Sequence, residues 1–117
     1  MPRCEIRYRD SKIRDLIRAH ADEITEAIAA ATTTTDRTGT VDPSYVKLEL
    51  THAPDDINVR DISISLSARA LPGRMGRERE IARATRAAFV AATGGHYSVG
   101  VWVVLSEHST YREYTPE

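Results

Sequence analysis

A single cysteine, Cys4, occurs among the 117 residues, so the chain can form no internal disulfide and offers no thiolate-rich metal site. The sequence also lacks an apolar run of transmembrane length, and its first residues lack the apolar core of a signal peptide. These absences lead us to expect a protein of the reducing cytoplasm with no membrane partner.

The net charge is also small, because the chain has 16 basic and 17 acidic residues and hence a formal charge of −1. Nothing in this balance suggests a nucleic-acid partner. The chain is long enough for one domain but too short for two separate cores, and 41% of its residues are hydrophobic. We therefore expect one domain over residues 1–117. Basic residues are crowded near the amino terminus, where a solvated basic face is the simplest interpretation: Arg3, Arg7, Arg9, Lys12, Arg14 and Arg18.

The first half of the chain predicts a strand, a helix and a second strand. Residues 4–9 alternate between apolar and polar, which is typical of a half-buried strand. Asp10 or Ser11 can cap a helix that runs to about Ala31, with apolar residues at helical spacing. Residues 32–43 show no periodicity and indicate a loop. A second alternating segment, 45–50, predicts the next strand.

The second half repeats this plan. Residues 62–68 alternate strictly and predict a strand, and a turn follows at Pro72-Gly73. Residues 77–93 favour a helix that ends at Gly94-Gly95. Residues 97–105 are rich in valine and predict the last strand. The two halves, 2–52 and 58–107, have similar lengths, which suggests an internal repeat.

Two α+β architectures agree with this order of elements. One is the ferredoxin-like β-α-β-β-α-β sandwich, which is found in binding modules and enzymes alike. The other places two β-α-β units side by side in one four-stranded mixed sheet, with two helices on one face. That sheet leaves its second face bare, which typically leads to oligomerisation. Periodicity alone does not distinguish them.

The amino terminus carries a more specific signal. The chain begins Met1-Pro2, and Pro2 opens a strand at once. A turn with a cation, Lys12, follows, then a long amphipathic helix and the strand Val46-Lys47-Leu48-Glu49-Leu50. This order resembles the tautomerase superfamily, in which a short chain starts with a catalytic proline and carries arginines at the turn and on the strand. The resemblance aligns those arginines with Lys12 and, across a longer loop, with Lys47.

The second half resembles the same unit, with Gly73-Arg74 before its helix and a Val-Trp-Val-Val-Leu-Ser-Glu segment at its end. The whole is similar to the double-unit members of the superfamily, such as 5-carboxymethyl-2-hydroxymuconate isomerase, cis-3-chloroacrylic acid dehalogenase and macrophage migration inhibitory factor. The resemblance implies the tautomerase fold, a homotrimer, a small anionic substrate, and no metal or organic cofactor. Gly100 departs from the pattern, since it stands where an arginine would be expected.

The resemblance also implies a set of site residues. Removal of Met1 would leave Pro2 with a free secondary amine that can act as a general base if burial and nearby cations disfavour its charged form. Cations would hold a substrate carboxylate and stabilise charge developing on oxygen. The candidate catalytic residues are Pro2, Arg74 and Lys47, and the candidate substrate-binding residues are Lys12, Arg69 and Glu113.

The sequence therefore predicts a cofactor-independent tautomerase or isomerase of small unsaturated 2-hydroxy or 2-oxo carboxylates. Two alternatives stay open. One is a hydratase or dehalogenase of 3-substituted acrylates, although the histidine and the full arginine pair of those enzymes are missing. The other is a non-catalytic binding module. Trp102 is expected in the core or a subunit interface, and Cys4 in the core.

Overall fold

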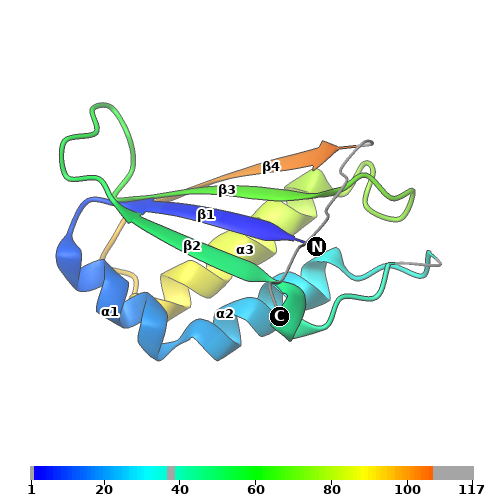
Figure 1. Cartoon of the computed structure of the whole chain (residues 1–117). Helices are drawn as coiled ribbons and strands as arrows, with labels where there is room; N and C mark the ends of the chain where they lie inside the picture. The colour runs from blue at the N-terminus through cyan, green and yellow to red at the C-terminus, as the bar shows by residue number, and fades with distance from the viewer. Residues whose placement is uncertain (1, 37–38, 107–117) are drawn as a thin grey trace, which may run out of the picture.

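The computed structural model describes residues 2–36 and 39–106. The three helices and one 3-10 helix accompany a single four-stranded sheet, and Figure 1 shows α1, α2 and α3 on the same side of it. None of the helices in the described ranges is long and apolar enough to cross a membrane. In chain order the elements are β1 (Arg3–Tyr8), α1 (Ser11–Ala19), α2 (Ala21–Thr32), η1 (Pro43–Tyr45), β2 (Lys47–His52), β3 (Ile62–Arg69), α3 (Glu78–Ala92) and β4 (Val99–Ser106).

The strand order β2-β1-β3-β4 distinguishes the two predicted architectures. β1 runs parallel to β2, and β3 runs parallel to β4, so each β-α-β unit keeps its own two strands side by side. β1 and β3 join the units and are antiparallel. A ferredoxin-like sandwich would split each β-α-β unit, so that architecture is excluded. The fold is the predicted mixed sheet with its helices on one face.

The core lies between the sheet and the helices. Cys4, Ile6 and Tyr8 alternate with exposed residues along β1 and point into it, as the sequence pattern predicts. β3 follows the same alternation, and Ile6 pairs with Ile64 at the centre of the β1·β3 ladder. The helices cover these strands with fully buried isoleucines and with Phe89. Cys4 is 0% exposed, and burial raises the pKa of its thiol to about 12, so it is a packed apolar residue.

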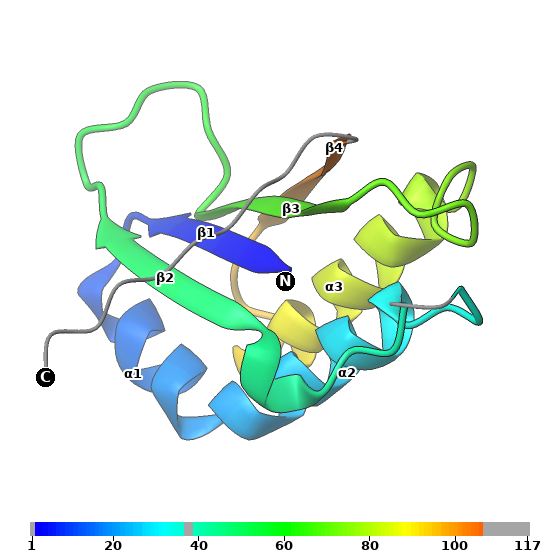
Figure 2. The same ribbon diagram turned by 45° about the vertical axis from the view of Figure 1, so that its right-hand side comes forward.

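The prediction of one helix over residues 11–31 is wrong, because the helix is interrupted at His20. This residue has φ −117° and ψ 22°, and it ends α1 while it begins α2. The interruption gives two short helices, α1 and α2, which lie on the same side of the sheet (Figure 2). The sequence does contain a signal for it: Arg18 lies in the last turn of α1, and Asp22 and Glu23 lie in the first turn of α2. Each charge complements the dipole of its helix end.

The prediction that the second strand begins at Tyr45 is also wrong. Residues Pro43–Tyr45 form η1, because Asp42 Oδ1 accepts a hydrogen bond from the Ser44 amide at 2.9 Å and caps the turn. β2 therefore begins at Lys47. The remaining strand and helix ends agree with the predictions to within two residues.

The second face of the sheet has no helix over it (Figure 2). On this face Arg3 makes two hydrogen bonds to Glu49, each 2.9 Å long, across β1 and β2. Trp102 and Val104 project from β4 with 78% and 51% of their surface exposed. Trp102 is therefore not a core residue, and the prediction of a subunit interface is the one that stays open for it.

Phe89 gives a direct test of the core. It is the only phenylalanine in the chain and is 0% exposed. We expect Phe89→Ala to lower the free energy of unfolding by about 3–5 kcal/mol, because the substitution removes buried apolar surface and leaves a cavity. Urea denaturation followed by circular dichroism measures this. Val90→Ala, at the 37% exposed neighbouring position, is the control and should cost less than about 1 kcal/mol. Equal losses would contradict the core described above.

Candidate active site

A cavity of about 300 Å³ lies beside the first residue of β1, and both halves of the chain contribute to its walls. Pro2, which is buried, forms part of it, and the carbonyl of Pro2 accepts a hydrogen bond from the Lys47 amide at 3.1 Å. This bond holds the start of the chain against β2. The cavity is lined by Pro2, Thr40, Val41 and Tyr45 from the first half and by Arg69, Leu71 and Arg74 from the second half.

The antiparallel pairing of β1 and β3 explains why Arg69 lies near Pro2. Arg3 pairs with Ser67, so β3 reaches the level of Pro2 as it ends. Arg69 is the last residue of β3 and is exposed. The loop 70–77 then turns back, so that Arg74 also lines the cavity. Of the six predicted site residues, Pro2, Arg69 and Arg74 are thus brought to one cavity.

Arg74 is held by backbone carbonyls and is only 3% exposed. Its Nε donates to the Thr32 carbonyl at 2.7 Å, and its Nη1 donates to the Arg69 carbonyl at 2.8 Å. Burial lowers the pKa of this guanidinium and the nearby Arg69 lowers it further, whereas Asp36 raises it. No hydrogen bond of Nη2 is found within residues 2–36 and 39–106. Arg74 therefore connects the end of α2 to the end of β3 and lines the cavity.

The side chain of Asp36 links the loop 70–77 to the segment after α2 through hydrogen bonds. Its Oδ2 accepts hydrogen bonds from the Gly73 amide at 2.7 Å and from the Thr34 hydroxyl at 2.8 Å. These bonds, the Gly73 amide above all, lower the pKa of Asp36 below its ordinary value of 3.8. Glycine is needed at position 73, because a Cβ there would come within 2.7 Å of the Thr34 Cβ.

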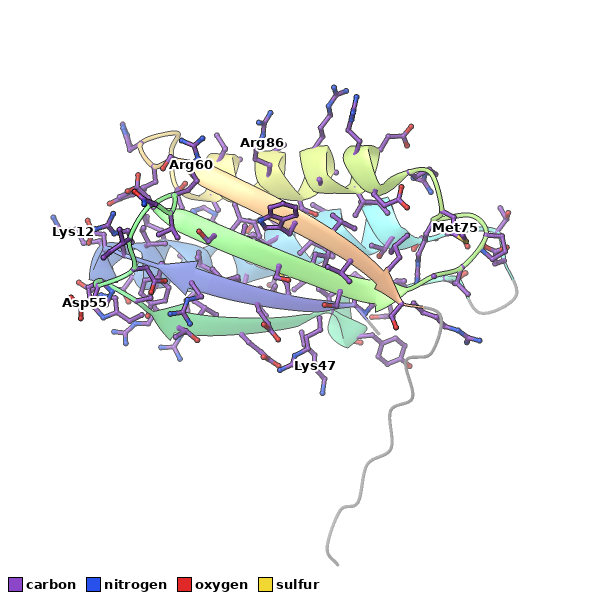
Figure 3. The ribbon with its side chains drawn as sticks, turned by 90° about the horizontal axis from the view of Figure 1, so that it is seen from above. Lys12, Lys47, Asp55, Arg60, Met75 and Arg86 are labelled. Carbon is purple, nitrogen blue, oxygen red and sulfur yellow. The ribbon has the colours of Figure 1, made fainter. Side chains whose placement is uncertain are left out.

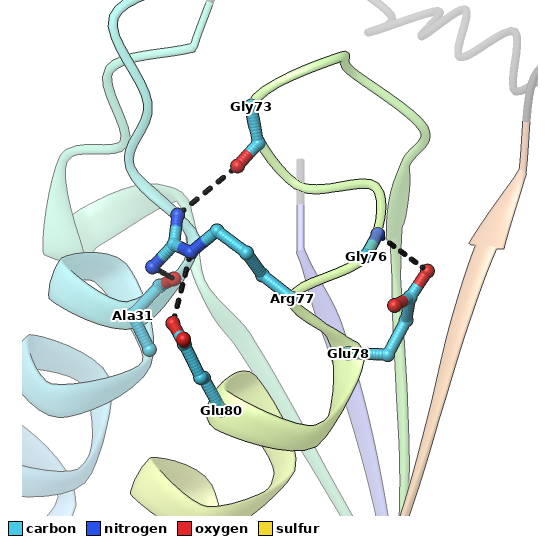
Figure 4. Close-up of polar contacts among 6 residues, drawn as sticks. All are labelled: Ala31, Gly73, Gly76, Arg77, Glu78 and Glu80. Atoms are coloured by element: carbon cyan, nitrogen blue, oxygen red, sulfur yellow. Dashed lines mark hydrogen bonds and ion pairs between the residues drawn. The ribbon is translucent and has the colours of Figure 1, made fainter.

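Arg77 adds a second connection between the same segments. Figure 4 shows its guanidinium between the Gly73 carbonyl, the Ala31 carbonyl and Glu80. Its Nη1 lies 3.1 Å from the Gly73 oxygen, and its Nε lies 3.1 Å from Glu80. Three side chains, those of Asp36, Arg74 and Arg77, therefore hold the wall of the cavity that faces Pro2.

The other predicted site residues do not reach this cavity within one chain. Lys47 begins β2 next to Pro2, but its exposed side chain is not part of the cavity wall. Lys12 lies in the first turn of α1, at the far end of β1, about 20 Å away by the rise of the strand. Figure 3 shows the two lysines well separated. Glu113 lies outside the described residues.

Sequence reasoning missed the part of the wall that comes from residues 40–45. Thr40, Val41 and Tyr45 lie in a stretch without periodicity, so nothing in the pattern linked them to Pro2. Asp36 was missed for the same reason. The available signal was local: aspartate or threonine side chains that bind an amide two residues on, as Thr34 does with Asp36 and Asp42 does with Ser44.

No cluster of three or more His, Cys, Asp or Glu that could hold a metal ion is found in the described ranges. The polar groups that line the cavity beside Pro2 are guanidinium groups, a threonine and a tyrosine. Such a lining can bind an anion and donate hydrogen bonds to it.

No protein-family model matches the sequence, and no curated protein does. Solved structures do match the fold. The chain is similar to a 5-carboxymethyl-2-hydroxymuconate isomerase from Deinococcus radiodurans R1, with 15% identity and a TM-score of 0.59 over 97% of this chain and 90% of that one. A macrophage migration inhibitory factor from Toxoplasma gondii matches with 15% identity and a TM-score of 0.62, over 95% of each chain.

A third match is the R7 fused 4-OT wild-type asymmetric trimer, with 11% identity and a TM-score of 0.60, over 91% of this chain and 85% of that one. The chain thus has the fold of the tautomerase superfamily. Within that class it has the double-unit arrangement, with two β-α-β units joined in one sheet. At these identities the likeness defines the fold alone.

The bonds of Asp36 predict a specific pH dependence of stability. A carboxylate whose pKa is lower in the folded state stabilises the protein above its ordinary pKa of 3.8 and loses this contribution as the pH falls below that value. We expect Asp36→Asn to be less stable than the wild type at pH 7, and the difference to shrink as the pH falls from 5 to 3.

Thermal unfolding at several pH values measures that difference. Asp55→Asn removes an exposed carboxylate that makes no hydrogen bond or ion pair within the described residues, and it should follow the wild type throughout. A pH-independent difference for Asp36→Asn would show that Asp36 does not hold the loop through its charge.

Proposed function

We propose that this protein is a cofactor-independent tautomerase or isomerase that moves a proton in small unsaturated 2-hydroxy or 2-oxo carboxylates. The supporting observation is the cavity in which the buried Pro2 lies with Arg69 and Arg74. In this cavity the Pro2 nitrogen would act as an amine base beside two cations and apolar side chains. The proposal places the reaction in the cytoplasm, after removal of Met1 has left Pro2 with a free secondary amine.

In the proposed reaction the Pro2 nitrogen takes a proton from one atom of the conjugated enol and returns it to another. The apolar side chains of Val41 and Leu71 in the wall disfavour the charged amine, which keeps the base available near neutral pH. Arg74 stabilises the negative charge that develops on the substrate oxygen. The exposed Arg69 binds the substrate carboxylate, for which its planar fork of donors is suited.

A homotrimer forms part of this proposal. Within one chain Lys12 lies at the far end of β1 from Pro2, so a role in binding substrate requires Lys12 of another subunit. The uncovered face of the sheet, with Trp102 78% exposed, supplies a surface for that assembly. One protein of similar fold is described as a trimer. Lys47, on the exposed start of β2, would then act at the boundary between subunits.

A hydratase or dehalogenase of 3-substituted acrylates is the second candidate, because Arg69 and Arg74 together supply a pair of arginines beside Pro2. Such a reaction also needs a carboxylate or another base to activate water. None of the described residues that line the cavity is a carboxylate or a histidine. We therefore prefer the tautomerase, whose reaction needs only the amine and the cations. A non-catalytic binding module of the same fold is the outcome if no reaction is found.

The first experiment compares the wild type with Pro2→Ala in the ketonisation of 2-hydroxymuconate and phenylenolpyruvate. We expect the wild type to accelerate the reaction and Pro2→Ala to reduce kcat/KM at least 100-fold, since the variant loses the secondary amine. The wild-type rate should also fall at acidic pH as the base becomes protonated.

Pro54→Ala, at an exposed proline beyond the end of β2, is the control and should retain the wild-type rate. Intact-mass measurement of each sample establishes whether Met1 has been removed. Equal rates for Pro2→Ala and the wild type, in samples without Met1, would reject the amino-terminal base.

The role of Arg69 predicts a separate kinetic effect. Arg69→Gln should raise KM for an anionic substrate about tenfold or more, because a charge-assisted contact to the carboxylate is lost. The fold should be retained, because Arg69 bonds to Arg74 through its backbone carbonyl, which the substitution leaves in place. Steady-state kinetics with thermal unfolding distinguishes the two effects. Arg18→Gln, on the exposed face of α1, serves as the control, and an unchanged KM for Arg69→Gln would remove Arg69 from the site.

A further inference from the structure

A second cationic cavity, of about 280 Å³, lies between α3 and the edge strand β4. Four arginines line it: Arg60, Arg79, Arg83 and Arg86. We name this group the arginine cluster. No acidic residue is found among the described residues that line the cavity. The cluster is not a consequence of a basic chain, because the formal net charge is −1.

Two separate elements bring the arginines together. Arg79, Arg83 and Arg86 follow one another by four and three residues on α3, so they share one face of the helix. Arg60 comes from the segment before β3 and lies against Gly100, where a Cβ would be 3.2 Å from the Arg60 Cγ. Figure 3 shows Arg60 and Arg86 on the β4 and α3 side of the molecule, with Met75 at the other end.

The arginine cluster has no carboxylate partner in the part of the chain that the structure describes. Within residues 2–36 and 39–106, none of the four side chains makes a hydrogen bond or an ion pair. The carboxylates that follow Arg79 and Arg60 in the sequence make their bonds to other groups: Glu80 pairs with Arg77, and Asp61 accepts hydrogen bonds from the Ser98 amide and hydroxyl. Like charges spaced by four residues on a helix destabilise it. A bound anion would remove this repulsion.

We propose that the arginine cluster binds a small anion with two or more negative charges, of the phosphate or phosphate-ester class. Guanidinium groups form paired hydrogen bonds to phosphate oxygens. Several guanidinium groups together balance an anion with two or more negative charges, whereas a single carboxylate carries only one. The cavity is large enough for a phosphate with a small substituent. Gly100 and its valine neighbours form the floor at the edge of the sheet.

This site is separate from the cavity beside Pro2. It lies where β4 begins, beside Ile62 at the start of β3, whereas Arg69 of the Pro2 cavity ends β3. The two cavities share no lining residue. The proposal therefore does not depend on the tautomerase function, and ligand binding tests it without any measurement of activity.

Inorganic pyrophosphate and inorganic phosphate are the probes, and binding is measured by calorimetry at constant ionic strength. We expect saturable binding of one anion per chain, with succinate at least tenfold weaker. Backbone amide signals of Gly100 and Val101 should shift in nuclear magnetic resonance spectra, because these residues line the cavity. Weaker binding at higher salt is expected for a charge-driven site.

The double variant Arg83→Gln/Arg86→Gln should weaken pyrophosphate binding at least tenfold, and Arg60→Gln, from the opposite wall, should weaken it as well. Arg14→Gln/Arg18→Gln removes the same amount of charge from the exposed face of α1 and should bind within twofold of the wild type. Circular dichroism of each variant tests whether it is folded.

Absence of saturable binding to the wild type would overturn the proposal, and so would equal losses in the two double variants. Binding of succinate as tight as that of pyrophosphate would overturn the assignment to phosphates. If phosphate binds as tightly as pyrophosphate, the free anion is sufficient, whereas tighter binding of pyrophosphate favours a substituted phosphate as the ligand. Either of these two results supports the site.

Discussion

The antiparallel pairing of β1 with β3 is the interaction on which the rest of the structure depends. It joins two β-α-β units that otherwise pair only within themselves, and it aligns Ile6 with Ile64 in the middle of the core. The same register carries β3 to the level of Pro2 as it ends at Arg69. A shift of one residue would turn the buried side chains of β3 to the open face. The register that buries the core therefore also forms the cavity beside Pro2.

Most of the polar interactions near that cavity serve to position its wall. The Nε and Nη1 of Arg74 donate hydrogen bonds to the carbonyls of Thr32 and Arg69, and the carboxylate of Asp36 accepts one from the Gly73 amide. The bonds of Arg74 to Thr32 and of Asp36 to Gly73 connect segments that are about 40 residues apart in the chain. In the proposed reaction Arg74 therefore has two tasks, because its fixed position is what orients its remaining donors. An exposed arginine such as Arg69 can bind an anion but contributes little to the position of the wall.

Charge is distributed unevenly for a chain whose net charge is −1. Arg69 and Arg74 lie at one end of the sheet, and the arginine cluster lies at the other end, beside α3. Between them the open face of the sheet carries paired charges, with Arg3 bound to Glu49 and Arg7 bound to Asp56. Within the described residues, Arg69, Arg74 and the arginine cluster line cavities without an ion pair, whereas Arg3 and Arg7 on the open face are paired. Under the two proposals, anionic ligands bind at both ends of the sheet, and the open face with the exposed Trp102 remains available to another subunit.

The sequence by itself determined the elements and the faces they bury, because strand alternation in 62–68 and helical spacing in 77–93 are local properties of the chain. It also singled out Pro2, Arg69 and Arg74, through a resemblance of short motifs. Only the tertiary structure decided the strand order and the entry of Arg69 into the cavity, since each depends on how distant segments pack. Asp36 illustrates the limit: its partner, Gly73, is 37 residues away, and no pattern within a window of sequence reports such a contact.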